Sequence, residues 1–158
     1  MKIKALLATL FILAITSGCA GLIPKPYIQN VPVASGDLNV EAQLLLKVAY
    51  TSIGRTQYYP PDNQTMYNLW LKITNNSKKA IKADLTKSYM LEGKEAIGAS
   101  MYMEGKKFAV NGKKDPVITL KPGETAEYRL VYVLEQDKVP DMFVWKGVGE
   151  IKIPQNQS

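Results

Sequence analysis

The side chains available for chemistry narrow what this chain can do. Its 158 residues include no histidine and one cysteine, Cys19. Histidine is the commonest general base, and serine nucleophiles and transition-metal sites usually depend on it. Serine nucleophiles can also work without histidine when a lysine follows three residues later. No serine in this chain has a lysine at that spacing. Hydrolysis would therefore have to depend on carboxylates alone.

Two pairs of acidic residues lie close together in the sequence, Glu92 with Glu95 and Asp137 with Asp141. A carboxylate-based hydrolase needs two acids that converge in one cleft. Both pairs lie in turn-like segments rich in lysine or proline, which indicates solvated loop residues. The alternating acidic loop with a central glycine that binds calcium has no match in the sequence either. We therefore expect a protein that is not an enzyme and has no cofactor.

Met101 and Met103 form a softer candidate site, because residues two apart in a strand project from the same face. Thioether sulfurs bind Cu(I), and Met90 would complete the group from a neighbouring strand. Methionine more often fills irregular space in a core. The prediction is therefore that these side chains are structural and that the chain has no metal site.

Three aromatic residues are candidates for binding a partner or ligand: Tyr58, Tyr59 and Trp70. Adjacent side chains in an extended segment point in opposite directions, so at least one of the two tyrosines is expected to face solvent. Trp70 is out of phase with Leu69 and Leu71, which places it on the opposite face of its strand. The alternative is that a loop covers Trp70, or that it is the buried aromatic of a sandwich strand, and that the tyrosines cap the sheet.

The first 20 residues have the parts of a secretory signal: a basic start, an apolar stretch and small residues around Cys19. The apolar run, of roughly 11 residues, is too short to span a bilayer. This segment resembles the lipobox of bacterial lipoproteins, in which the cysteine is modified with diacylglycerol and becomes the first residue. The resemblance implies that residues 1–18 are removed and that acyl chains such as palmitate anchor Cys19 in the membrane. Two or more acyl chains give stable attachment.

Ala20 concerns the choice of membrane. In bacteria with two membranes, aspartate directly after the lipidated cysteine commonly retains a lipoprotein in the inner membrane, and alanine does not. The resemblance therefore implies the outer membrane, with the domain facing the periplasm. A single-membrane organism, surface display, and ordinary secretion after cleavage near Gly18 or Ala20 stay open as alternatives.

The charge is mildly basic, at +6 for the whole chain. Loss of Lys2 and Lys4 with the leader lowers it to +4. The basic residues are scattered as lysine doublets beside turn formers, without the arginine-rich stripe of a nucleic-acid binder. We therefore exclude nucleic acid as a partner.

Beyond the leader the residue pattern predicts strands. Prolines and glycines interrupt residues 19–39, which indicates a lipidated tether, followed by a domain over residues 40–153 and a polar tail, 154–158. The candidate strands are residues 43–51, 66–74, 80–85, 87–91, 96–103, 107–110, 117–120, 126–134, 142–146 and 148–153. We expect 66–74 and 80–85 to form a hairpin. We expect about seven to nine strands from these segments, which is typical of an all-β sandwich.

Two turn motifs carry a further resemblance. Asn75-Asn76-Ser77 ends one strand, and Leu120-Lys121-Pro122-Gly123-Glu124 precedes another, with its proline and glycine placed for a type II turn. Over residues 40–153 this order resembles the telokin-like, immunoglobulin-type domain of small secreted or lipid-anchored bacterial proteins. The resemblance implies an immunoglobulin-like β-sandwich and names no activity.

Together these features favour a non-catalytic lipoprotein of the bacterial envelope that binds another protein as an accessory or scaffold subunit. The alternative is a module that binds glycan or envelope polymer, using Tyr58, Tyr59 and Trp70 as stacking surfaces and the lysine doublets for acidic groups. A Cu(I) site and a carboxylate-based hydrolase are lesser alternatives.

Overall fold

The structure is a computed structural model that describes residues 25–105 and 112–155. Cys19, the predicted leader and the predicted strand at 107–110 lie outside these ranges. Within them, no helix is both long enough and apolar enough to cross a membrane.

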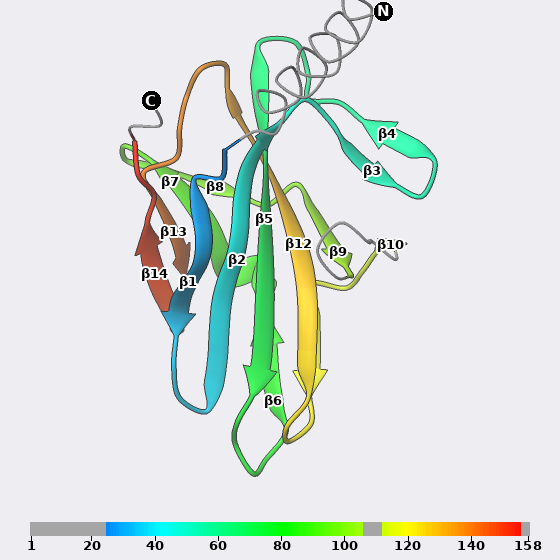
Figure 1. Ribbon diagram of the computed structural model, residues 1–158, viewed down its shortest axis with the longest axis vertical. Helices are drawn as coiled ribbons and strands as arrows, with labels where there is room; N and C mark the ends of the chain where they lie inside the picture. Colours follow the sequence, from blue (N-terminus) through cyan, green and yellow to red (C-terminus); the bar gives the residue numbers. More distant parts are fainter. Residues whose placement is uncertain (1–24, 106–111, 156–158) are drawn as a thin grey trace, which may run out of the picture.

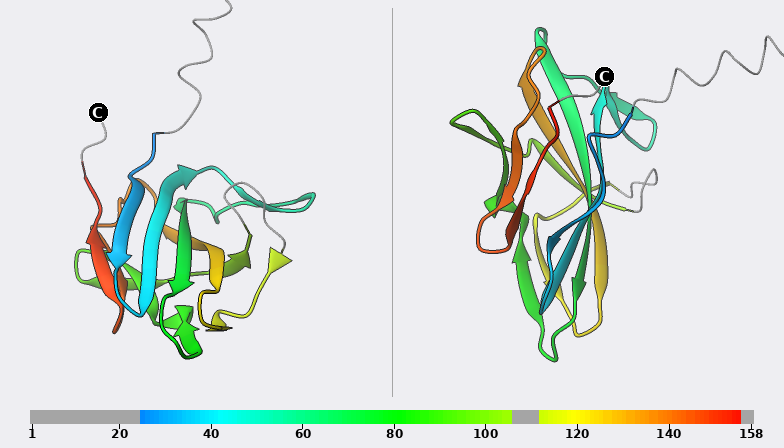
Figure 2. Two further views of the ribbon diagram at one scale, coloured as in Figure 1. Left: turned by 60° about the horizontal axis from the view of Figure 1, so that its bottom comes forward. Right: turned by 60° about the vertical axis from the view of Figure 1, so that its left-hand side comes forward.

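The chain folds into an all-β sandwich with two layers, in which every strand pair within the described ranges is antiparallel (Figures 1 and 2). One layer is a six-stranded sheet in the order β1 (Ile28–Ala34), β2 (Leu38–Val48), β5 (Gln64–Asn75), β12 (Thr125–Glu135), β9 (Met101–Glu104) and β10 (Gly112–Lys113). The other layer combines a four-stranded sheet, β14 (Gly149–Lys152), β13 (Met142–Trp145), β7 (Ser88–Glu92) and β8 (Glu95–Gly98), with the pair β11 (Val117–Leu120) and β6 (Ile81–Asp84). A short 3-10 helix, η1 (Leu85–Lys87), links β6 to β7, and β3 (Thr51–Ile53) pairs with β4 (Thr56–Tyr58) as a separate hairpin.

The main core lies between the two layers. Alternate residues of β5 and β12, such as Leu69 and Leu130, face inward and pack in one cluster with Met90 and Phe143 of the other layer. All four side chains are fully buried, and burial of each contributes roughly 1.5–3 kcal/mol. The alternation that predicted a strand at 126–134 therefore reflects a real inner face.

A bulge in β2 changes which of its residues face outward. Ala42 pairs with Leu71 and Leu44 with Trp70, so Gln43 is an extra residue on the β2 side. Because one inserted residue reverses the alternation, Leu44 joins the outer face of the sheet, where it packs against Trp70. For this reason the part of β2 that follows the bulge is apolar on both faces.

The predicted hairpin of residues 66–74 and 80–85 is wrong. β5 pairs with β2 and β12, whereas β6 pairs with β11 in the other layer. The Asn-Asn-Ser turn therefore carries the chain from one layer to the other. The predicted strand at 96–103 likewise divides into β8 and β9, which belong to different sheets.

The boundary predicted at residue 40 is also wrong, because β1 lies inside the predicted tether and pairs with β2. Pro32 is exposed in this strand, and β1 is at the edge of the sheet, where a missing backbone donor is tolerated. β14 approaches β1 closely: a Cβ at Gly149 would collide with the carbonyl oxygen of Val33. The sandwich thus includes residues that composition alone assigns to a linker.

Asn75 organises the turns at one end of the sandwich. Its Nδ2 donates to the carbonyl oxygens of Lys79 and Leu120 at 2.7 and 2.9 Å. Its Oδ1 accepts hydrogen bonds from the backbone N–H and the hydroxyl of Ser77, at 2.9 and 2.8 Å. The motif that follows β5 is therefore joined to the end of β11. We refer to Asn75, Ser77, Lys79 and Leu120 as the turn cluster.

The turn from Lys121 to Glu124 has the predicted type II form. Gly123 has a φ of 75°, and the backbone N–H of Glu124 donates to the carbonyl oxygen of Lys121 at 3.0 Å. A positive φ at this place favours glycine. The N–H of Gly123 also donates to the carbonyl oxygen of Asn75 at 2.8 Å, which ties this turn to the turn cluster.

Candidate functional site

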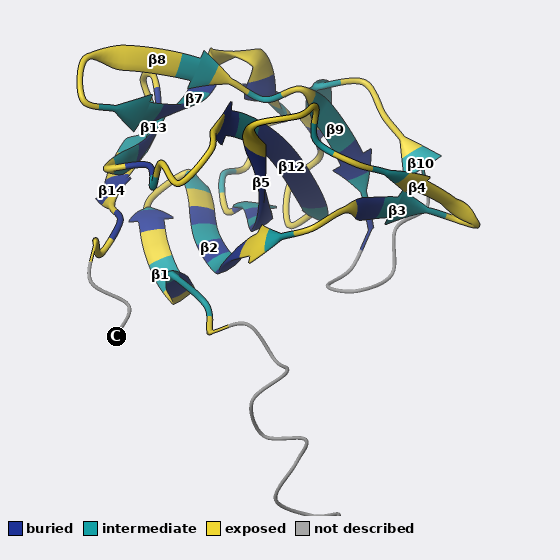
Figure 3. Ribbon diagram, turned by 90° about the horizontal axis from the view of Figure 1, so that it is seen from above, coloured by how far each residue is buried: buried dark blue, intermediate teal, exposed yellow. Residues whose placement is uncertain are grey.

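A cleft of about 660 Å³ lies on the outer face of the six-stranded sheet, beside the β3–β4 hairpin. Figure 3 shows this hairpin projecting from the right-hand side of the sandwich, with the largely buried strands β5 and β12 at the centre. The residues that line this hairpin cleft are Leu46, Lys47, Val48, Ala49, Tyr50, Thr51, Ser52, Asn68, Trp70 and Arg129. An apolar lining with a few polar groups at this volume is typical of ligand sites.

Strand register brings four outward side chains into one row. Leu44, Trp70, Arg129 and Met103 are successive partners across β2, β5, β12 and β9. The Arg129 guanidinium lies 5.8 Å from the Trp70 ring centroid, and its Nη2 donates to the Met103 sulfur at 3.3 Å. Arg129 is therefore held between an aromatic ring and a thioether.

The β3 strand covers Arg129. Nη2 also donates to the carbonyl oxygen of Ser52 at 2.6 Å, while the buried Nε has no acceptor. Only 7 % of the residue is exposed, and this burial lowers the pKa of the guanidinium by disfavouring its charged form. The hairpin is thus fastened to the sheet through a buried cation.

Asn68 lies one row away, beside Val131 of β12. It is 2 % exposed, and its Nδ2 makes a long bond of 3.3 Å to the hydroxyl of Thr51. Its buried Oδ1 has no hydrogen-bond partner. Buried polar atoms are normally paired, so both Asn68 and Arg129 leave capacity for further hydrogen bonds at this cleft.

The aromatic candidates take three different places. Tyr59 is 64 % exposed and packs against Tyr50, itself 43 % exposed, with ring centroids 5.6 Å apart. Tyr58 is half-buried at the end of β4, with the Lys113 ammonium 5.3 Å from its ring centroid. Trp70 is only 3 % exposed. Its predicted position opposite Leu69 and Leu71 is correct, but it is covered and cannot serve as an exposed stacking surface.

The three candidate methionines are divided between the two layers, and two of the candidate acids have other partners. Met90 lies in the main core, whereas Met101 and Met103 pack on the outer face of the other layer. Asp141 accepts from the Gly93 N–H at 2.6 Å, and Glu92 pairs with Lys138 at 2.7 Å. Across the described ranges, no three His, Cys, Asp or Glu side chains are placed to share a metal ion.

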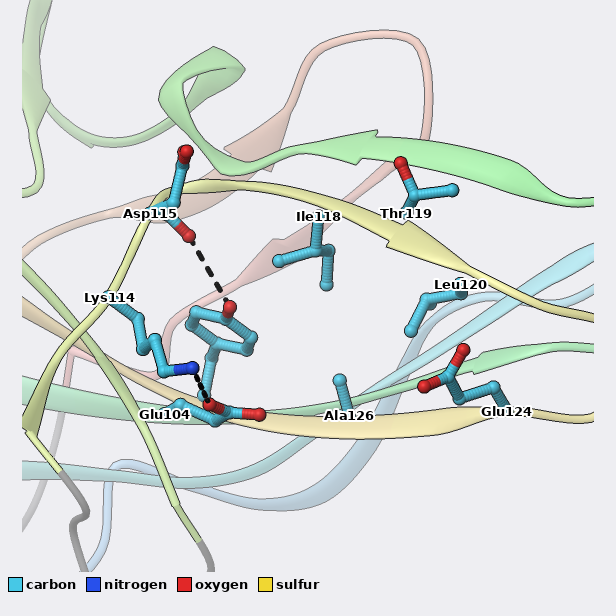
Figure 4. A pocket seen from close by; sticks show the side chains of 9 residues that line it. Glu104, Lys114, Asp115, Ile118, Thr119, Leu120, Glu124 and Ala126 are labelled. Atoms are coloured by element: carbon cyan, nitrogen blue, oxygen red, sulfur yellow. Dashed lines mark hydrogen bonds and ion pairs between the residues drawn. The ribbon is translucent and has the colours of Figure 1, made fainter.

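A smaller pocket of about 250 Å³ opens between β11 and β12 (Figure 4). Ile118 and Leu120 of β11 face Ala126 across it, and Lys114 and Glu104 form an ion pair of 2.9 Å at one end. The hydroxyl of Tyr128 donates to the carbonyl oxygen of Asp115 at 3.3 Å. These polar groups are paired with one another, so the hairpin cleft is the stronger candidate.

Sequence reasoning missed Tyr50, Thr51, Asn68 and Arg129. The sequence contained one signal for these residues. The run at 43–51 is apolar on both faces, as expected of a strand covered on both sides. That Arg129 is buried beneath this cover depends on the β3–β4 hairpin, a tertiary contact that residue pattern does not encode.

Comparison with protein-family models finds no match for this chain. Comparison with curated proteins finds no match either. Solved structures do resemble it. A conserved hypothetical protein from Bacillus anthracis is 17 % identical with a TM-score of 0.60, over 83 % of this chain and 99 % of that one.

Two further structures share the architecture. An uncharacterised β-sandwich protein from Clostridium difficile is 12 % identical with a TM-score of 0.55, over 81 % of this chain and 91 % of that one. A candidate lipoprotein from Bacillus subtilis is 11 % identical with a TM-score of 0.50, over 79 % of this chain and 39 % of that one. At these identities the likeness shows the fold alone, and that fold is a β-sandwich.

Proposed function

We propose that this chain is a lipid-anchored, non-catalytic lipoprotein of the bacterial envelope whose sandwich binds another protein at the hairpin cleft. The observation that carries the proposal is the exposed pair of Tyr50 and Tyr59 beside a cleft with unpaired polar atoms. These two are the large hydrophobic residues exposed on the described surface. Tyrosine is among the residue types that contribute most to protein interfaces.

The anchor in this proposal is Cys19, within the lipobox-like segment. The likeness to a candidate lipoprotein with the same architecture supports it. β1 begins at Ile28, so residues 20–27 would connect the lipid to the sandwich. The finer expectation, an outer-membrane position facing the periplasm, depends on Ala20.

Lipid anchoring is tested with an alkyne fatty acid fed to cells that produce the protein. We expect the wild type to be labelled and to sediment with membranes, and Cys19→Ser to lose both properties. Ala20→Asp keeps the label and, in a bacterium with two membranes, moves the protein from the outer to the inner membrane. An unmodified Cys19 thiol in the wild type, seen by mass spectrometry, would contradict the proposal.

Protein binding is tested with a photo-crosslinking residue placed at Tyr59 in intact cells. The matched control position is Glu95, which is exposed in β8 of the other layer. We expect position 59, and not position 95, to give one defined adduct. When the crosslinker is placed at Tyr50 instead, Tyr59→Ala should weaken the adduct with the same partner. Equal adducts at both positions, or none, would count against an interface here.

The glycan alternative uses the same exposed rings, since a sugar could stack on Tyr59. Trp70 no longer supports it, because its ring is covered. Sedimentation with purified peptidoglycan separates the two functions. Binding that Tyr59→Ala removes would favour the glycan reading over the protein one.

A further inference from the structure

Arg129 is a buried cation without an acidic partner. The ion pairs among residues 25–105 and 112–155 involve other groups, and no acidic side chain lies within 4.0 Å of its guanidinium. The segments outside these ranges contain neither aspartate nor glutamate. Among residues 25–105 and 112–155 the guanidinium therefore has no aspartate or glutamate partner.

A buried charge without an acidic partner is unusual. Removing a guanidinium from water is costly unless a counter-charge and hydrogen bonds compensate. Here the compensation consists of the Ser52 carbonyl, the Met103 sulfur and the face of Trp70. Arginine has five N–H donors, and Nε still has no acceptor. If Arg129 served packing alone, methionine or leucine would suffice at this position.

The surroundings match the two parts of an amphipathic anion. Arg129 supplies a planar fork of donors, the geometry that binds a carboxylate through two hydrogen bonds. Leu46 and Val48 supply an apolar wall in the same cleft. Lys47 also lines the cleft and adds positive charge, although Asp137 lies 4.0 Å from its ammonium.

We propose that the hairpin cleft binds a carboxylate attached to an apolar or aromatic group, with Arg129 as its charge partner and Leu46 and Val48 against its apolar part. This inference rests on the proposed function, in which the cleft is the binding surface. The carboxylate can come from a free organic acid or from the C-terminal residue of a polypeptide, and both present the same chemistry to Arg129.

The probes are matched acid and amide pairs. Indole-3-acetate and indole-3-acetamide test the free acid, and an acetylated tripeptide ending in phenylalanine, with a free or an amidated C-terminus, tests the polypeptide. Binding to the full mature protein in detergent is followed through the Arg129 Nε–H resonance by NMR. We expect at least one acid to shift that resonance and to bind about tenfold or more tightly than its amide, as a charge-assisted hydrogen bond would give.

Variants separate binding from folding. Arg129→Met should remove the preference for acid over amide, and Arg129→Lys should keep only part of it, because an ammonium lacks the planar fork. Arg55→Met is the control, since Arg55 is exposed in the β3–β4 turn. A cooperative urea transition in each variant would show that these variants are folded.

Equal binding of acid and amide, an acid preference that survives Arg129→Met, or no binding of either acid would overturn the inference. Crosslinking at Tyr59 separates this failure from that of the proposed function. A defined adduct at Tyr59 without acid binding leaves the interface standing and removes the carboxylate. Acid binding without an adduct supports the site and contradicts the protein partner.

Discussion

Asn68 and Asn75 are both buried in β5, yet their polar atoms differ. Asn75 is fully buried, and its amide makes four hydrogen bonds within the turn cluster. Asn68 makes one long bond through Nδ2 and none through Oδ1. The same residue type in one strand thus serves a complete network at one place and an incomplete one at another.

This difference in hydrogen bonding distinguishes a residue that stabilises the fold from one that is available to a ligand. A complete buried network specifies one packing arrangement, and removing a member leaves its partners unpaired. An incomplete network costs stability in the free protein, and a ligand that completes it recovers that cost. The turn cluster is therefore suited to folding, and the hairpin cleft is the proposed recognition site.

Asn75→Ala carries the largest expected effect on stability. The substitution removes all four hydrogen bonds and leaves the buried carbonyl oxygen of Leu120 without this donor. We expect the free energy of unfolding to fall by about 3 kcal/mol, measured by urea denaturation. Asn76→Ala is the matched control, because its side chain makes one exposed bond of 3.3 Å to the Gly36 carbonyl. Equal losses in the two variants would show that the turn cluster is not special.

Local pattern was enough to predict this part of the molecule. The β12 alternation, the strand at Val117–Leu120 and the type II turn at Gly123 were all recoverable, because period and turn chemistry are local properties. Strand pairing is not local. The hairpin predicted after β5 failed because β6 changes layers, and only tertiary packing decides that choice.

β1 and Arg129 are two further features that depend on tertiary packing and that local residue pattern could not predict. Prolines and glycines made residues 19–39 resemble a tether, yet Ile28 and Val33 are buried once β1 pairs with β2. Arg129 alternates with inward-facing residues, which predicts exposure. Its burial arises from β3, more than 70 residues earlier, through a bond to Ser52 with a sequence separation of 77.

The second prediction uses pH to compare the two faces of β12. Tyr128 faces the inside and Arg129 the outside, and burial shifts their pKa values in opposite directions because both charged forms are disfavoured. Burial first, and then the negative charges of Glu104 and Asp115, raise the pKa of Tyr128 to about 12. Its unfolded pKa is 10.0, so its contribution is complete below pH 10 and is lost as pH rises to 12.

Urea unfolding between pH 9 and pH 12 measures this contribution. We expect Tyr128→Phe to lose less stability than the wild type over that range, by up to about 2 kcal/mol. Tyr59→Phe is the control, because this tyrosine is exposed and its hydroxyl donates to the exposed side chain of Gln57. Parallel pH profiles for the wild type and Tyr128→Phe would mean that the inner face of β12 admits water.

Arg129→Met carries the smallest expected effect on stability. Methionine has similar length and can pack against Trp70 and Met103, while its introduction removes a buried charge that no acid compensates. Replacing buried ionic groups by apolar ones is often neutral or stabilising, so we expect a change within about 1 kcal/mol in the free energy of unfolding. Loss of the bond to Ser52 opposes that gain and loosens the β3–β4 hairpin, which hydrogen exchange of Thr51 and Ser52 would report. A loss as large as that of Asn75→Ala would instead make Arg129 a structural residue, and the contrast between the two regions of the sheet would disappear.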